Sequence, residues 1–211
     1  IAKPVISVVT QVRVDKEDPS FKKPSKPIGP FYTKEEADAE AAKDGSTYVE
    51  DAGRGYRKVV PSPMPKEIVE KEAVRALVEA DVLTICSGGG GIPVVAEDGQ
   101  YVGVEAVNDK DFSARVLAEN VDADRLIILT GVDNIYINYN QPDQKALEQI
   151  SVAEAEEYIK EGHFAAGSML PKIEAALDFV KGDDKRKAII TSIENLENID
   201  KEAGTVISQK G

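Results

Sequence analysis

Four consecutive glycines, residues 88–91, form the segment of this sequence best suited to holding a small charged group. They follow an apolar run, residues 81–87, with the composition of a β-strand. Glycine has no Cβ, so its backbone can take positive φ and a ligand can approach its N–H groups closely. A nest of such N–H groups suits an anion, usually a phosphate. We therefore expect Gly88, Gly89 and Gly90 to bind one; the alternative is a tight turn that needs small residues.

Two lysines stand out by their position at the starts of predicted helices. Lys110 and Lys172 each stand near the start of a predicted helix, where a cation opposes the helix dipole by a few tenths of a kcal/mol. That cost is tolerable if the lysines help to hold a phosphate. Asp111 could keep a lysine ammonium in place, although an acidic residue near a helix start is also favourable by itself. The alternative for each lysine is an ordinary surface position.

Two further turns stand at the ends of predicted elements. Residues 130–133 follow a predicted strand, and residues 167–169 precede a predicted helix. Ligands in α/β proteins sit beyond the carboxyl ends of the strands, so these turns could line one nucleotide site together with the glycines. Asp133 could bind a ribose or Mg²⁺, or cap the turn. Tyr136 belongs to a group at 136–139 that could flank an adenine; a core or edge-strand role is the alternative.

This inventory suits phosphoryl transfer, which needs cations and N–H groups aimed at the moving charge and little covalent help. His163 is the only histidine and Cys86 the only cysteine, so the sequence offers neither a Ser-His pair to rely on nor a zinc cluster. No dinucleotide or P-loop fingerprint surrounds the glycines, which disfavours a redox cofactor. The net charge of −12 argues against nucleic acid and acidic membranes as partners.

The elements that must position these residues alternate along the chain. We expect strands at 5–14, 48–51, 56–60, 82–86, 126–130, 134–138, 187–191 and 205–207, and helices at 33–45, 66–80, 108–119, 151–160 and 170–181. The strands at 82–86 and 126–130 are expected to be buried, the second of them on both faces. Thr33 and Glu36 form a capping-box pattern at one helix start. Helices alternating with buried strands predict a three-layer α/β fold.

The Pro-rich residues 15–31 and the two strands that follow indicate an insertion. We divide the chain into an α/β body, residues 1–14 and 61–211, and an inserted protruding subdomain, residues 15–60.

A single cysteine allows no disulfide within the chain, which fits a protein of the reducing cytoplasm.

Six motifs, taken together, resemble carbamate kinase, a member of the amino-acid kinase family. They are residues 26–31 (KPIGPF), 50–63 (EDAGRGYRKVVPSP), 88–94 (GGGGIPV), 109–112 (DKDF), 129–133 (LTGVD) and 167–176 (GSMLPKIEAA). The resemblance runs through the whole chain in order. It implies an open αβα sandwich, a homodimer, and the reaction of ADP with carbamoyl phosphate to give ATP and carbamate, with Mg²⁺, in fermentative arginine breakdown.

The resemblance also implies roles for particular residues. Lys110 and Lys172 stabilise the transferring phosphoryl group, Asp111 organises the lysines, and Lys26 of the inserted subdomain reaches over the active site. The resemblance further implies nucleotide binding by the turn at 130–133, which includes Thr130, Gly131 and Asp133, and by the segment around Met169.

The sequence departs from the family at its start. The family's Gly-Gly-Asn-Ala and Gly-Asn-Gly-Pro loops are absent, and about the first third of its length is missing. We therefore expect these 211 residues to be inactive or nearly so, and to leave an exposed sheet edge. The alternatives are a non-catalytic nucleotide-binding or dimerising fragment, and a sister kinase acting on an amino acid or a nucleoside monophosphate.

Overall fold

The computed structural model describes residues 2–51 and 53–211, and its chain divides into two compact units. The first comprises Ile1–Glu70 and Asp81–Ser113, and the second Lys71–Ala80 and Ala114–Gly211. Ile1, where the predicted body begins, and Ala52, inside the predicted insertion, lie outside the described residues. The predicted insertion falls within the first unit, and its status as a separate subdomain stays a prediction.

The first unit contains a four-stranded sheet in the order β6-β2-β8-β9. Its strands are β2 (Gln11–Arg13), β6 (Glu67–Ile68), β8 (Ile92–Glu97) and β9 (Gln100–Gly103). β2 runs parallel to β8, and the other pairs are antiparallel. Val12, Ile68 and Val94 are buried at 0–1% exposure. A separate parallel pair joins β1 (Val5–Ser7) to β7 (Leu83–Ile85).

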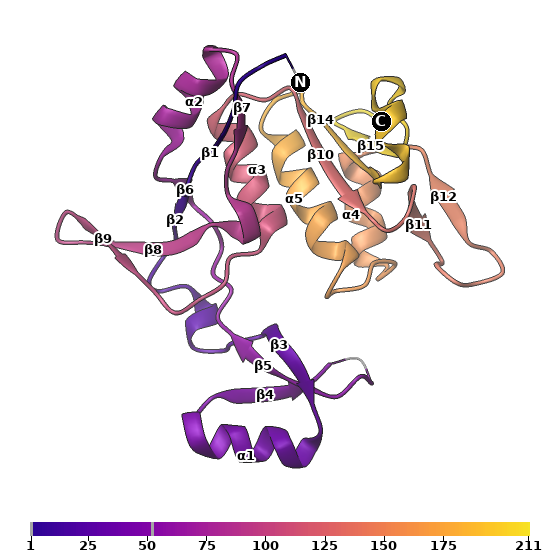
Figure 1. The fold of residues 1–211 in the computed structure, drawn as a ribbon. Helices are drawn as coiled ribbons and strands as arrows, with labels where there is room; N and C mark the ends of the chain where they lie inside the picture. Colours follow the sequence, from indigo (N-terminus) through magenta and orange to yellow (C-terminus); the bar gives the residue numbers. More distant parts are fainter. Residues whose placement is uncertain (1, 52) are drawn as a thin grey trace. The chain divides into compact units, whose positions relative to one another are not determined.

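The chain between β2 and β6 forms an antiparallel three-stranded sheet in the order β3-β5-β4, beside one helix (Figure 1). Its elements are β3 (Lys26–Tyr32), helix α1 (Lys34–Asp44), β4 (Thr47–Glu50) and β5 (Tyr56–Val60), preceded by the 3-10 turn η1 (Pro19–Phe21). The predicted capping box is confirmed: Thr33 accepts from the Glu36 N–H, and the Glu36 carboxylate accepts from the Thr33 N–H. Gly45 ends α1 in the left-handed conformation, at φ +70°.

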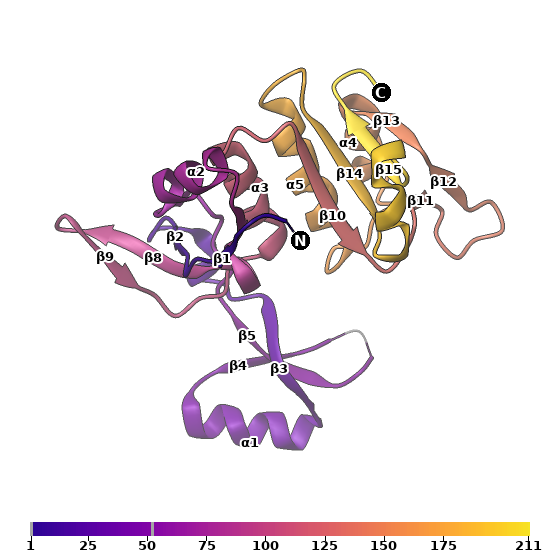
Figure 2. The same cartoon turned by 45° about the horizontal axis from the view of Figure 1, so that its top comes forward.

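The second unit is built on a mixed sheet in the order β10-β14-β15-β13, with α4 and α5 on one face (Figure 2). Its strands are β10 (Arg125–Thr130), β13 (Gln149–Ser151), β14 (Lys187–Ser192) and β15 (Thr205–Ser208), with a hairpin of β11 (Ile135–Ile137) and β12 (Lys145–Leu147). Its helical segments are α2 (Lys71–Glu79), most of α3 (Lys110–Asn120), α4 (Val152–Lys160), α5 (Met169–Lys181) and the 3-10 segment η3 (Glu194–Lys201). Side chains such as Ile173, Phe179 and Ile190, all at 0% exposure, form its core.

Several predicted boundaries are wrong in ways that have physical reasons. The strand expected at 5–14 is two strands, β1 and β2, because residues 8–10 leave one sheet and enter another. The helix expected at 66–80 begins only at Lys71, since Ile68 pairs with Val12 in a sheet. Strand β3 was not predicted, because Pro27 and Pro30 suggest irregular backbone. Nor were β8, β9, β12, β13 and η3 predicted.

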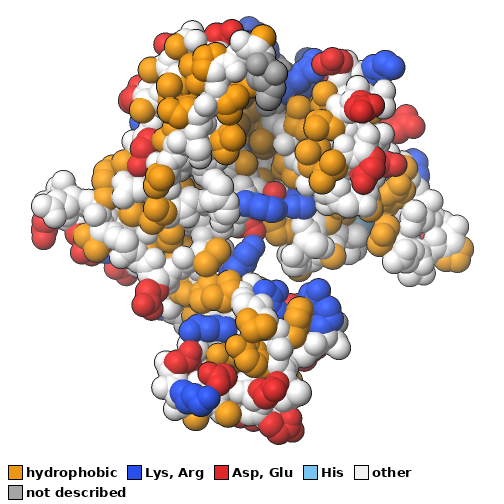
Figure 3. All heavy atoms as spheres, in the orientation of Figure 1, with side chains coloured by type: hydrophobic (Ala, Val, Ile, Leu, Met, Phe, Trp, Pro, Cys, Tyr) orange, Lys and Arg blue, Asp and Glu red, His pale blue; other side chains and the backbone are white. Residues whose placement is uncertain are grey.

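The burial predicted for two strands is also wrong. β10 alternates, with Ile127 and Leu129 about 40% exposed, instead of being buried on both faces. In β7, Leu83 and Ile85 are exposed, and the adjoining Cys86 is only half-buried. Figure 3 shows apolar side chains gathered over β1 and β7 on the face in view. These strands are apolar as predicted, but no described element of their own unit covers these side chains.

Candidate functional site

The glycine segment follows β7 as a single tight turn. Gly88–Gly90 form the short 3-10 element η2, and Ser87 before it takes the left-handed conformation. The Gly90 N–H donates to the Ser87 carbonyl oxygen at 2.9 Å, and the Gly91 N–H to that of Gly88 at 3.3 Å. Gly89, Gly90 and Gly91 all have positive φ, which L-residues with a Cβ rarely adopt.

The four glycines fall into two pairs. A Cβ on Gly90 would lie 2.5 Å from the Asn108 carbonyl oxygen, and one on Gly91 would lie 2.5 Å from Val12 Cγ2. The turn's own geometry therefore explains Gly90 and Gly91. Around Gly88 and Gly89 a Cβ would meet nothing within 4 Å, and within the described residues their N–H groups make no hydrogen bond. Of the three glycines predicted to bind an anion, Gly88 and Gly89 have N–H groups available for one. The N–H of Gly90 already donates to Ser87 within the turn.

The start of α3 lies against this turn. Gly90 accepts two hydrogen bonds at its carbonyl oxygen, from Asn108 Nδ2 at 3.2 Å and from Ser113 Oγ at 2.8 Å. Lys110 and Asp111 stand between these two donors in the sequence, and Lys110 Nζ lies 3.1 Å from both carboxylate oxygens of Asp111. Asp111 is 7% exposed. A charged Lys-Asp pair is thus attached to the glycine turn.

Lys26 reaches the same helix start from β3. Its Nζ donates to Asp109 Oδ2 at 2.6 Å, and Asp109 Oδ1 accepts from the Asp111 N–H at 2.9 Å. Burial acts to raise the pKa of the Asp109 carboxyl, but the hydrogen bonds from Lys26 and Asp111 and the nearby lysine charges outweigh it and hold the pKa below its ordinary value. Asp109 is therefore charged at neutral pH. It was not among the predicted site residues, although it lies next to Lys110.

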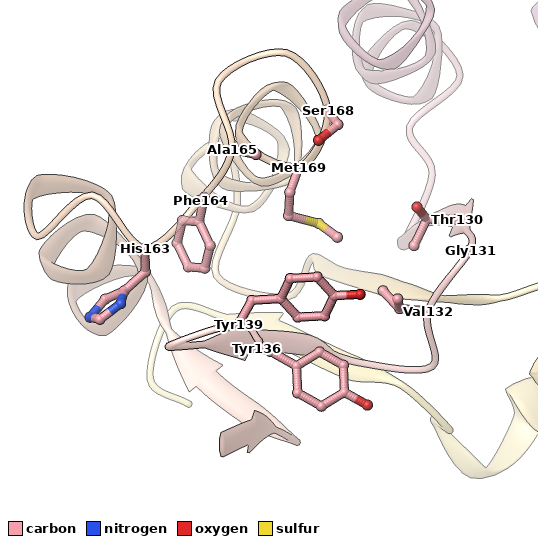
Figure 4. Close-up of a pocket in the computed structure, with 10 residues that line it drawn as sticks. All are labelled: Thr130, Gly131, Val132, Tyr136, Tyr139, His163, Phe164, Ala165, Ser168 and Met169. Atoms are coloured by element: carbon pink, nitrogen blue, oxygen red, sulfur yellow. The ribbon is translucent and has the colours of Figure 1, made fainter. Parts of the chain in front are cut away.

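The second unit carries a pocket of about 300 Å³. Four residues predicted to bind nucleotide line it, namely Thr130, Gly131, Tyr136 and Met169, and its other lining residues are Val132, Tyr139, His163, Phe164, Ala165 and Ser168. Figure 4 shows the Met169 side chain extending from α5 toward the Tyr139 ring. The Tyr136 and Tyr139 rings are 5.9 Å apart and tilted by 47°. Flat apolar walls with a few polar groups suit a planar heteroaromatic ring.

The solitary histidine belongs to the wall of this pocket. His163 Nδ1 accepts from the Asn138 N–H at 3.4 Å, and Nε2 lies 3.0 Å from Glu161 Oε2. Its ring also meets Tyr158 edge-on at 5.8 Å. These contacts anchor the segment after α4 to the end of β11. The sequence predicted no catalytic pair for His163 and did not predict its place in the pocket wall.

The remaining predicted site residues, Asp133 and Lys172, both belong to the second unit. Asp133 is exposed in a bend after β10 and does not line the pocket. Lys172 lies half-buried in the first turn of α5, in the second unit. Across the described residues no three His, Cys, Asp or Glu side chains form a metal-binding group. Among them, no helix has the length and apolar character needed to cross a membrane.

Known proteins that resemble this chain in sequence belong to one family. The model of the amino acid kinase family matches residues 32–192. Carbamate kinase of Lentilactobacillus hilgardii is 55% identical over 210 residues, covering 99% of this chain and 66% of the relative. Carbamate kinase 1 of Enterococcus faecium is 56% identical over 211 residues, covering 99% and 67%. The chain thus spans about two thirds of the length of these relatives.

Solved structures give the same result. Carbamate kinase from Giardia lamblia bound to AMP-PNP matches with a TM-score of 0.86 and 45% identity, over 98% of this chain and 66% of that one. The same enzyme bound to citric acid matches with a TM-score of 0.88 and 43% identity, over 97% and 64%. The predicted α/β fold of amino-acid kinase type is confirmed, and the chain belongs to the amino acid kinase family, with carbamate kinases as relatives over nearly its whole length.

Proposed function

We propose that the complete encoded protein is a carbamate kinase, which transfers a phosphoryl group between ATP and carbamate. The observation that carries the proposal is the attachment of the glycine turn to the helix start that bears Lys110 and Asp111. The N–H groups of Gly88 and Gly89 and the lysine then lie on two segments that hydrogen bonds join, and such a set of donors suits the charge of a transferring phosphoryl group. Relatives named carbamate kinase at 50–56% identity support the choice of acceptor.

The proposed step needs no histidine. The bond between phosphorus and the carbamate oxygen of carbamoyl phosphate breaks, and a terminal oxygen of ADP forms the new bond to phosphorus. Lys110 and Lys172 stabilise the negative charge on the transferring oxygens, and Asp111 holds the ammonium of Lys110. Lys26, held by Asp109, supplies a further cation from the inserted segment. The N–H groups of Gly88 and Gly89 are the uncharged donors to the same group.

We place the adenine in the pocket of the second unit. Tyr136, Tyr139 and Met169 offer flat apolar contact. Thr130 ends β10 and Gly131 follows it, at the carboxyl end of the strand, where nucleotides bind in α/β proteins. The solved complex of the Giardia lamblia enzyme with AMP-PNP supports a nucleotide in this family. Mg²⁺ would arrive on the nucleotide, because the described side chains offer no three-residue metal group and Mg²⁺ often uses one or two carboxylates plus phosphate oxygens.

The 211-residue chain has a narrower proposed role. Since it spans about two thirds of its relatives, we propose that by itself it binds nucleotide and is inactive or nearly so. The pocket favours this second candidate, because all its lining residues belong to one unit. For the complete protein we propose a cytoplasmic homodimer that works in the ATP-forming direction during fermentative arginine breakdown.

An acceptor panel tests the choice of substrate. The complete protein is given ATP and Mg²⁺ with carbamate (from ammonium and bicarbonate), glutamate, N-acetylglutamate or UMP, and ADP release is measured. We expect release with carbamate alone. Release with an amino acid or with UMP instead would replace the proposal by a sister kinase of the same family.

A further inference from the structure

The glycine turn is braced by three buried polar side chains to which the phosphoryl-transfer roles assign nothing. Thr10 Oγ1 accepts from the Ser87 N–H at 2.9 Å, and the Thr10 carbonyl oxygen accepts from the Ile92 N–H at 2.9 Å. Asn108 and Ser113 donate to the Gly90 carbonyl oxygen between these two points. Thr10, Asn108 and Ser113 are 4%, 2% and 0% exposed, respectively. The turn is therefore fixed at its entry, middle and exit.

The hydrogen bonds from Asn108 and Ser113, which we call the brace, fix the direction of the Gly90 carbonyl. With two donors on its oxygen, the Gly90 carbonyl must face the start of α3, which fixes the orientation of the peptide that follows Gly90. The hydrogen bonds from Gly90 and Gly91 N–H back to Ser87 and Gly88 fix the rest of the turn. The N–H groups of Gly88 and Gly89 are the two left over. An anion site built from backbone depends on such prior orientation, since donors that must first reorganise stabilise less.

We infer that Asn108 and Ser113 are positioning residues, which hold the glycine turn so that the N–H groups of Gly88 and Gly89 face one phosphate-like anion. This rests on the proposed function for the identity of the anion as a transferring phosphoryl group. Neither residue touches the reacting atoms; each acts through the Gly90 carbonyl. The same helix start bears Lys110, so the brace also fixes the lysine's backbone relative to the two N–H groups.

Substitutions of these side chains can distinguish an effect on the position of the glycine turn from an effect on the stability of the protein. Asn108 Oδ1 is buried and has no partner among the described residues, so Asn108→Leu removes one hydrogen bond and also one unsatisfied buried acceptor. Ser113→Ala removes only the hydroxyl. Each single variant leaves the Gly90 carbonyl with one donor, and the double variant leaves it with none. Val206→Ala, a change at a buried position in the sheet of the second unit, is a control that loses stability and leaves all residues of the turn and of the α3 start unchanged.

The first experiment measures ATP formation from ADP and carbamoyl phosphate by the complete protein. We expect each single variant to lower kcat about 3- to 10-fold and the double variant about 100-fold, which is the loss that a displacement of about 1 Å can cause. We expect KM for ADP and the turnover of Val206→Ala to stay unchanged. A double variant with lowered thermal stability but normal kcat would reduce the brace to a structural role and overturn the inference.

The second experiment does not depend on turnover. Inorganic phosphate is titrated into the ¹⁵N-labelled complete protein, and the amide signals of the turn are followed. We expect the Gly88 and Gly89 signals to shift in the wild type and not in the double variant. An unresponsive wild-type turn, or an equal response in the double variant, would overturn the inference. Absent ATP formation with a responsive turn would instead reject carbamate as the substrate and leave the brace standing.

Discussion

At the scale of single residues, the proposed chemistry depends on a few cations held by carboxylates. Lys110 lies 3.1 Å from both oxygens of Asp111, and Lys26 lies 2.6 Å from Asp109. In a protein with a net charge of −12, these ammonium groups are the cations that the proposed transfer would use. Their value lies in stabilising charge that develops during transfer.

Lys110→Ala and Lys172→Ala should each lower kcat of the complete protein by about 10²–10³, since one electrostatic donor is worth that much in rate. The fold should stay intact, because neither side chain lies in the apolar core. Steady-state ATP formation and circular dichroism measure the two quantities. Lys160→Ala, an exposed lysine in the last turn of α4, is the matched control. Near-normal turnover in either site variant would reject the assigned role.

Asp109 gives a prediction in pH. Because its folded pKa lies below the ordinary value of about 3.9, its pairing stabilises the protein fully above that value and is lost as the pH falls through the folded pKa. Asp109→Asn should therefore cost about 1 kcal/mol at pH 7, discounted because Lys26 is 36% exposed on its side chain. The difference should shrink below about pH 4.

Urea unfolding at several pH values measures this difference. Asp98→Asn, an exposed change in the turn between β8 and β9, controls for the loss of one charge. A difference that stayed constant from pH 7 to pH 3 would show that the Lys26–Asp109 pair is not its source.

At the scale of elements, the glycine turn separates what a sequence pattern can predict from what it cannot. The strand, the loop and the positive φ angles were predictable, because glycine alone takes positive φ at little cost and a run of four excludes a regular element. The division of the four glycines was not predictable. The division depends on the positions of Asn108 and Val12 beside Gly90 and Gly91. A local sequence pattern does not show contacts between residues that are far apart in the sequence.

The division of the glycines into two pairs predicts that substitutions at Gly91 and at Gly88 affect different properties of the protein, stability and turnover respectively. Gly91→Ala should destabilise the protein by at least about 1–2 kcal/mol, because its φ is +76° and its Cβ would lie 2.5 Å from Val12 Cγ2. Gly88→Ala should leave the free energy of unfolding nearly unchanged, since its φ is ordinary and the space is open, yet should lower kcat. Denaturant unfolding and ATP formation check the pair. Equal stability losses, or normal kcat in Gly88→Ala, would contradict the division.

At the scale of the whole molecule, the α/β class and most helices were predictable from the 3.6-residue pattern and, for α1, from the capping box of Thr33 and Glu36. The two-residue strand β6 was not predictable, because Glu67 and Ile68 are too few to show a period. Predicted burial failed for β7 and β10 because composition shows that a strand is apolar but not whether anything covers it.

The site residues that lie in short turns of recognisable composition were predictable, and those whose contacts lie far away in the sequence were not. Four of the pocket residues come from short turns or segments with recognisable composition, namely Thr130, Gly131, Tyr136 and Met169. Asp109, Asn108 and Ser113 were missed because their roles arise from contacts with Lys26 and Gly90, which lie 18 to 83 residues away. Side chains whose function is to hold other groups leave little trace in a single sequence.

The most direct test of the central claim is ATP formation from ADP, Mg²⁺ and carbamoyl phosphate, run in parallel on the complete encoded protein and on the 211-residue chain. We expect turnover in the complete protein and none, or nearly none, in the chain, while both bind AMP-PNP through the Tyr136–Tyr139 pocket. Turnover by the 211-residue chain would contradict the proposal that it is inactive alone. Absence of turnover in both would contradict the assignment as a carbamate kinase itself.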